Sequence, residues 1–274
     1  MKPMNRPKVF FIFLFTLFFN VSSFAGWVIT QKSYASDQGE ASAIIETVYM
    51  EDDIMKIVQD DMITIFNLND ETITLMNPEK MVYWKGTIAD YKTDIKKALK
   101  AAMEEQLKKA PEKQKPMIRN MYQGMMESID DPSKFAGEEP EEYQLKIEKT
   151  SEKERIAGYQ AVKYQVKVNQ QLKEEAWLSE SNRAHSEFNI PKFYSVFGDF
   201  VNQAEAGAYY QKDKEYIEFA KLGFPLKSIN YYGGYESVSH VTNLERENID
   251  VSEFQPPTDY RKVNLTEVGI EEKE

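Results

Sequence analysis

The chain has no cysteine and only two histidines among its 274 residues. Without thiols, the fold has no disulfides and the chemistry has no cysteine nucleophile or ligand. His185 and His240 lie far apart in the sequence, so a histidine-based metal site is not expected. A GxSxG elbow, a Walker loop and a GxGxxG fingerprint are also missing. We therefore expect no enzymatic activity, and no catalytic, cofactor-binding or metal-binding residues.

Basic residues are fewer than acidic ones. The chain has 34 Lys and Arg against 45 Asp and Glu, a formal net charge of −11. Nucleic acids are bound by basic surfaces, so they are not expected partners. The charge also disfavours adhesion to anionic lipid surfaces. It leaves open an apolar ligand that is held inside a cavity.

Residues 1–25 have the three parts of a secretory signal peptide. A basic start is followed by an apolar run over 9–19, and Ser23 and Ala25 are small residues where a signal peptidase cleaves. The apolar run is shorter than the ~20 residues that a membrane-spanning helix needs. We predict cleavage between Ala25 and Gly26. The mature protein would be soluble, periplasmic or secreted, and without a transmembrane anchor.

Short apolar runs separated by turn residues predict a β-meander. The first block comprises residues 40–50, 54–60, 62–68, 71–76 and 80–86, with Asp, Asn and Pro at the breaks. Connections this short join antiparallel neighbours. A second block comprises residues 143–147, 162–168, 171–178, 225–232 and 236–244. Apolar residues are adjacent in the first block, which predicts a cover on both faces of those strands.

Two amphipathic helices are predicted between these blocks, over about 87–129. In the first, Ile88, Tyr91, Ile95, Leu99, Met103 and Leu107 form one stripe. Thr87 and Asp90 resemble a capping box, and Pro111 ends the helix. The second carries Met117, Met121, Met125 and Ile129. This methionine stripe is either ordinary core against the sheet or a lid over a hydrophobic groove, since Met adapts to irregular binding surfaces. A further helix is predicted over 188–206.

Four motifs carry a resemblance to a known family. They are AGYQAVKYQVKV (157–168), EEAWLSE (174–180), KLGFPLKSINYY (221–232) and FQPPTDYRKV (254–263). In this order they resemble a family of exported bacterial proteins that is described as a domain of unknown function. That family is similar in architecture to the outer-membrane lipoprotein carriers of the LolA and LolB type. The resemblance implies an α+β fold, in which amphipathic helices cover the concave face of a strongly curved antiparallel β-sheet, an unclosed barrel. It implies no catalytic residues.

These observations predict one LolA-like domain over 26–263, with a helical insertion at about 87–129 and an acidic flexible tail over 264–274. The predicted function is that of an exported soluble binding protein, which holds a lipid, acyl chain or other hydrophobic ligand between the sheet and a helical lid. The candidate ligand and lid residues are Trp84, Leu99, Met103, Met117, Met121, Met125 and Trp177. The alternative is a non-enzymatic interaction or structural protein whose concavity its own side chains fill, because a core and a groove use the same residues.

Overall fold

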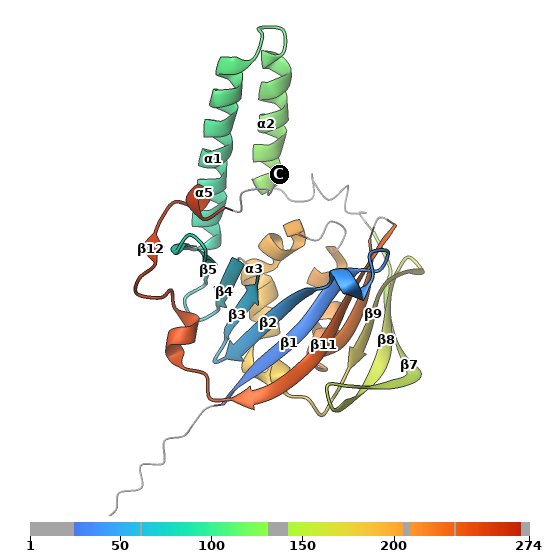
Figure 1. Ribbon diagram of the computed structural model, residues 1–274. Coiled ribbons are helices and arrows are strands. Elements are labelled where there is room, and N and C mark those ends of the chain that lie inside the picture. The colour runs from blue at the N-terminus through green and yellow to red at the C-terminus, as the bar shows by residue number, and fades with distance from the viewer. Residues whose placement is uncertain (1–24, 61, 131–141, 205–208, 233, 270–274) are drawn as a thin grey trace, which may run out of the picture.

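Figure 1 shows the computed structural model, which describes residues 25–60, 62–130, 142–204, 209–232 and 234–269. Twelve strands form one sheet. They are β1 (Gly26–Ala35), β2 (Ile44–Glu51), β3 (Ile54–Gln59), β4 (Met62–Asn67), β5 (Thr72–Asn77), β6 (Val82–Gly86), β7 (Leu145–Ile156), β8 (Tyr159–Val168), β9 (Gln171–Leu178), β10 (Pro225–Tyr232), β11 (Tyr235–Glu247) and β12 (Arg261–Lys262). Their order across the sheet is β12-β6-β5-β4-β3-β2-β1-β11-β10-β9-β8-β7.

The sheet consists of two meanders that β1 joins. Strands β2 to β6 are neighbours in chain order, and so are β7 to β11. All strand pairs are antiparallel except β12 with β6. The edge strands β7 and β12 are not paired with each other, so the barrel is unclosed within the described residues. The predicted α+β fold with an unclosed antiparallel sheet is therefore confirmed.

Two-residue turns set the antiparallel register. Asp52 and Asp53 have φ values of 47° and 62° between β2 and β3, and Asn169 and Gln170 have 50° and 66° between β8 and β9. Positive φ at both positions matches the twist of the flanking strands, and Asp and Asn tolerate it better than other non-glycine residues. This is why Asp52 and Asp53 located the β2–β3 hairpin correctly in the sequence.

The helices are α1 (Ile88–Lys109), α2 (Lys115–Asp130), α3 (Ile190–Ala204), α4 (Lys214–Ala220) and α5 (Leu265–Val268). In Figure 1, α3 lies in the hollow of the curved sheet. Its aromatic side chains surround Phe66 of β4, with ring centroids 5.3 Å from Phe193, 5.3 Å from Phe197 and 5.9 Å from Phe200. Such clusters add to the free energy of burial. The concave face is therefore covered by α3, together with α4.

The predicted lid is not over the sheet. Helices α1 and α2 form a hairpin that projects away from the sheet (Figure 1), and α1 has no buried residue. Three contacts fix the base of the hairpin. Thr87 and Asp90 form the predicted capping box, and Trp84 Nε1 donates a hydrogen bond of 3.0 Å to Asp94. The ring of Tyr91 lies 4.9 Å from that of Phe200, between centroids.

The methionine stripe of α2 is exposed rather than core. Met117, Met121 and Met125 have 70%, 49% and 37% of their surface exposed, whereas Tyr122 and Ile129 are buried. Because α2 packs along α1 and not on the sheet, its inner face runs through Tyr122. That residue lies one position beyond Met121, a rotation of about 100° around the helix.

The predicted flexible tail is ordered where the structure describes it. Asn264 caps α5 in a capping box with Glu267, and Val268 is 1% exposed. The Nζ of Lys80 donates to the carbonyl oxygen of Gly269 at 2.9 Å. Residues 264–269 are thus part of the fold, while 270–274 and the predicted signal residues 1–24 lie outside the described residues.

Candidate hydrophobic cavity

A cavity of about 190 Å³ lies between the sheet and helices α3 and α4. Its sheet side includes Met50 of β2, Met55 of β3, and Ala176 and Leu178 of β9. Its helix side is mainly aromatic: Phe188, Phe193, Tyr194, Tyr216, Phe219 and Phe224. An apolar concave site with few polar groups is the usual form of a small-molecule pocket.

Sheet curvature creates this cavity. Strands β3 and β9 are separated by β2, β1, β11 and β10 in the sheet. At about 4.8 Å per strand, a flat sheet would hold them roughly 24 Å apart. Because both strands line one cavity, the sheet must curl strongly between them, which agrees with Figure 1. Residues from the two meanders therefore meet only in the folded chain.

The β2–β3 turn holds the segment that leads into α3. The backbone N–H of Asp53 donates to the carbonyl oxygen of Glu187 at 3.0 Å. The carboxylate of Asp53 accepts from the backbone N–H of Asn189 at 2.6 Å. These bonds attach the start of α3 to the sheet and so position Phe188 and Phe193 at the cavity.

Glu174 of β9 is the one carboxylate among the lining residues of this cavity. It is 5% exposed, and the Tyr216 hydroxyl donates to it at 2.9 Å. Burial, and then the charge of Glu174, raises the pKa of Tyr216 well above its usual value. Tyr216 therefore stays a neutral donor over the physiological range. A ligand carboxylate placed beside Glu174 would meet a like charge at low dielectric.

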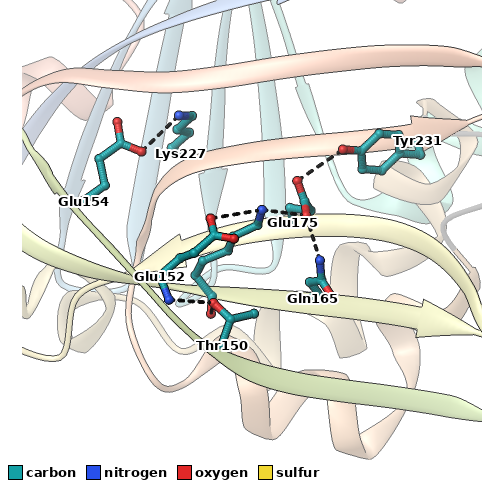
Figure 2. A network of polar contacts seen from close by, with 8 residues as sticks. Thr150, Glu152, Glu154, Gln165, Glu175, Lys227 and Tyr231 are labelled. Atoms are coloured by element: carbon teal, nitrogen blue, oxygen red, sulfur yellow. Dashed lines mark hydrogen bonds and ion pairs between the residues drawn. The ribbon is translucent and has the colours of Figure 1, made fainter.

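The opposite face of β9 carries a polar network, which Figure 2 shows. Trp177 is buried there, with Lys163 Nζ 5.0 Å and Lys227 Nζ 4.6 Å from its ring centroid. Lys163 pairs with Glu175 at 2.8 Å and with Glu152 at 3.4 Å. Lys227 pairs with Glu154 of β7 at 3.0 Å. The lysine stems thus cover Trp177, because long side chains bury their methylenes while the charge finds a partner.

Glu175 is the centre of this network. It accepts hydrogen bonds from Gln165 at 2.9 Å and from Tyr231 at 3.2 Å. Burial alone would raise the pKa of Glu175, but Lys163 and then Gln165 hold that pKa below its usual value. Burial together with the charge of Glu175 raises the pKa of Tyr231 to about 12. The network ties β7, β8, β9 and β10 together behind the cavity wall.

None of the seven predicted ligand and lid residues lines this cavity. Trp84 is buried at the base of the hairpin, and Leu99 and Met103 are half-buried along α1. Trp177 faces away from Ala176 and Leu178, as strand alternation predicted, but the cavity lies on their side. Met117, Met121 and Met125 lie on the projecting hairpin. Ala25 and Gly26, the predicted cleavage site, lie at the start of β1.

Sequence reasoning missed Glu174, Tyr216 and Phe219 as lining residues. The segment over 209–220 was assigned no structure, although Tyr216 and Phe219 stand three residues apart, at helical spacing. Glu174 precedes a second glutamate, and nothing in the sequence indicates which one faces the cavity.

Within the described residues, no group of three or more His, Cys, Asp or Glu side chains is arranged to hold a metal ion. In the same part of the chain, no helix combines the length and the apolar character that crossing a membrane requires.

The family described as "Domain of unknown function (DUF4412)" matches residues 96–260, more than half of the chain. The chain belongs to the DUF4412 family. The family resemblance drawn from the four sequence motifs is thus confirmed, and three of those motifs lie wholly within the matched range. No curated protein matches the chain.

Several solved structures share a distant likeness with this DUF4412 protein. The crystal structure of MucB has 13% sequence identity and a TM-score of 0.38, and the match covers 86% of this chain and 58% of MucB. The complex of Pseudomonas aeruginosa MucA and MucB has 12% sequence identity and a TM-score of 0.36, and the match covers 87% of this chain and 58% of the other. The structure of PNGF-II has 10% sequence identity and a TM-score of 0.35, and the match covers 89% of this chain and 32% of PNGF-II. The chain thus spans about a third of PNGF-II and under two thirds of MucB.

Proposed function

We propose that this protein is an exported, non-enzymatic binding protein that takes the apolar end of a lipid or similar ligand into the cavity under α3 and α4. The observation that carries the proposal is the cavity itself, whose lining is apolar and aromatic apart from Glu174. Export is supported by the signal-like residues 1–25. The cover of the ligand is α3 and α4, in place of the hairpin that the sequence suggested.

The size of the cavity limits the affinity. Its volume of about 190 Å³ is below the roughly 300–1,000 Å³ of ordinary ligand pockets. A compact volume of that size has roughly 160 Å² of surface, and burying that much apolar area yields about 4 kcal/mol. This corresponds to a Kd near 1 mM. We therefore expect part of an acyl chain to enter, and affinity to rise by about 0.8 kcal/mol for each methylene until the cavity is full.

Glu174 decides the orientation of the ligand. An anionic head group beside Glu174 would cost Coulomb energy in a poorly solvated site. The methyl end should therefore enter first and the head group should stay at the mouth. At equal chain length, alkanols and fatty acids should then compete almost equally for the cavity.

The test is displacement of a neutral fluorescent probe by n-alkanols of increasing length. Ala220 lines the cavity on α4, so Ala220→Phe should fill the cavity and abolish displacement while the fold survives. Lys214→Phe adds the same ring at an exposed position of α4 and is the matched control. Native mass spectrometry of protein from its own host should show co-purified lipid. If the folded protein binds no probe and carries no lipid, the filled-core interaction protein is the correct reading.

A further inference from the structure

One flank of α2, beside the face that packs on α1, carries an uncharged apolar stripe whose methionines the described fold leaves exposed. Met117, Met121 and Met125 are exposed along it, and a Cβ added to Gly124 would meet nothing within 4 Å. At 100° per residue these four positions span a sector of about 100°. The same sector contains Ser128 at the C-terminal end of α2, which is polar and buried. Exposed glycine inside a helix costs about 1 kcal/mol relative to alanine. A close approach by another helix would give Gly124 a role.

Charge is distributed unevenly along the hairpin. Residues 108–119 at its tip hold five basic residues and one acidic residue. The base, residues 88–97 and 127–130, holds three basic and four acidic residues. Outside residues 88–130 the chain has 25 basic and 38 acidic residues. The tip is therefore complementary in charge to the base of a hairpin and to the rest of the chain.

We propose that the Met117–Met125 stripe binds the same stripe of a second copy of this chain, with the two hairpins antiparallel. Each basic tip would then lie beside the more acidic base of the partner hairpin, and the four helices would form a bundle. The unbranched methionines can interdigitate, and Gly124 lets the helices approach closely.

The length of the hairpin makes this arrangement compatible with the net charge. The 22 residues of α1 span about 33 Å. Two antiparallel hairpins would therefore hold the acidic sheets at opposite ends, several Debye lengths of about 8 Å apart. Repulsion between the sheets would be screened, whereas the tip and base charges would lie within range of each other. An anionic bilayer would attract the tip but repel the rest of the chain, so a second copy fits better.

The absence of native cysteines permits a direct test. Met121→Cys or Gly124→Cys should form a covalent dimer under mild oxidation, because a disulfide requires Cα atoms within about 4.4–6.8 Å of each other. Gln123→Cys, on the opposite side of α2, should form no covalent crosslink. If Gln123→Cys crosslinks as readily as Met121→Cys, the proposed surface is wrong.

Sedimentation equilibrium of the purified protein supplies the second measurement. Dimerisation should weaken at high salt, and Met121→Glu should raise the Kd by about tenfold or more, while Gln123→Glu should not. A protein that is monomeric at every concentration, with no crosslink, overturns the proposal. Binding to phosphatidylglycerol vesicles that Met121→Glu abolishes, in a protein that stays monomeric, would overturn it in favour of a membrane surface.

Discussion

The Lys163–Glu175 pair offers the sharpest test of how the cavity wall is held. The two side chains are only 12% and 10% exposed, and their charged atoms are 2.8 Å apart. At an effective dielectric constant near 20, their Coulomb attraction is about 6 kcal/mol, most of it offset by the desolvation of both charges. Lys163→Met would leave Glu175 buried without its cation. Removing one partner of a buried pair costs about 3–5 kcal/mol.

We expect about 3 kcal/mol, the lower end, because Gln165 and Tyr231 still donate to Glu175 in the variant. The assay is urea unfolding followed by circular dichroism. The double variant Lys163→Met/Glu175→Gln should recover most of the loss, since neither charge of the pair then remains. Lys167→Met is the matched control on the same strand. It breaks a more exposed pair with Glu148, and should cost less than about 1 kcal/mol. Equal losses at Lys163 and Lys167 would refute the reasoning.

The unfolding free energies of wild type and Lys163→Met should differ by an amount that depends on pH. The dependence follows from the directions in which the pKa values of Glu175 and Lys163 are shifted. The pKa of Glu175 lies below its usual 4.5, so its contribution is complete above pH 4.5 and is lost as the pH falls through the folded-state value. Burial lowers the pKa of Lys163, but pairing with Glu175 and Glu152 outweighs that and raises it above 10.5. Its contribution is complete below pH 10.5 and is lost at higher pH. In Lys163→Met, Glu175 stays buried without its cation, so it takes up a proton at a higher pH than in the wild type. The difference in unfolding free energy between wild type and Lys163→Met should therefore shrink as the pH falls and the Glu175 of the variant is protonated, and should shrink again above pH 10.5.

Three further predictions concern other parts of the chain. At concentrations too low for self-association, Met117→Asp should leave the melting temperature unchanged. Ile129→Asp should lower the free energy of unfolding by several kcal/mol, because that side chain is buried. Equal effects of the two substitutions would contradict the assigned face of α2. Gly223→Ala should cost about 1–3 kcal/mol in chemical denaturation, since its Cβ would lie 2.9 Å from the carbonyl oxygen of Ser179; an unchanged midpoint would show that the backbone yields there. Intact-mass analysis of the exported protein should show loss of residues 1–25, and retention of Met1 would contradict the signal-peptide assignment.

Local signals in the sequence predicted most of the sheet. Strand β10 was predicted with the bounds that the structure has, because Pro225 starts it and Gly residues follow Tyr232. The hairpins were found because Asp and Asn occupy their turns. Strand β1 was missed. Its apolar start, Trp27–Ile29, follows the signal segment directly, and its second half is polar. Yet β1 is the strand that joins the two meanders, so the central pairing could not be read from local pattern.

The cavity could not be predicted from local pattern either. Its walls come from Met50 and Met55 in one meander, Glu174 and Ala176 in the other, and helices α3 and α4. These residues are brought together by curvature, which accumulates over many strands and is not encoded at any one position. In the second strand block, apolar and polar residues alternate over 143–147 and 162–168, a pattern typical of strands with one solvated face. In β9, however, every residue over 174–178 is buried, because lysine stems cover the outer face and α4 the inner one.

The α2 helix shows why a correct period can still give the wrong face. Met117, Met121 and Met125 recur every four residues, and so do Ile118, Tyr122 and Met126. Both stripes satisfy the spacing of an amphipathic helix. The choice between them depends on where the partner helix α1 lies, which the sequence of α2 does not contain. A helix with two apolar stripes beside each other can bury one against its own chain and present the other outward. The exposed stripe is then the one on which to search for a binding partner, and in this chain it is the stripe through Met121.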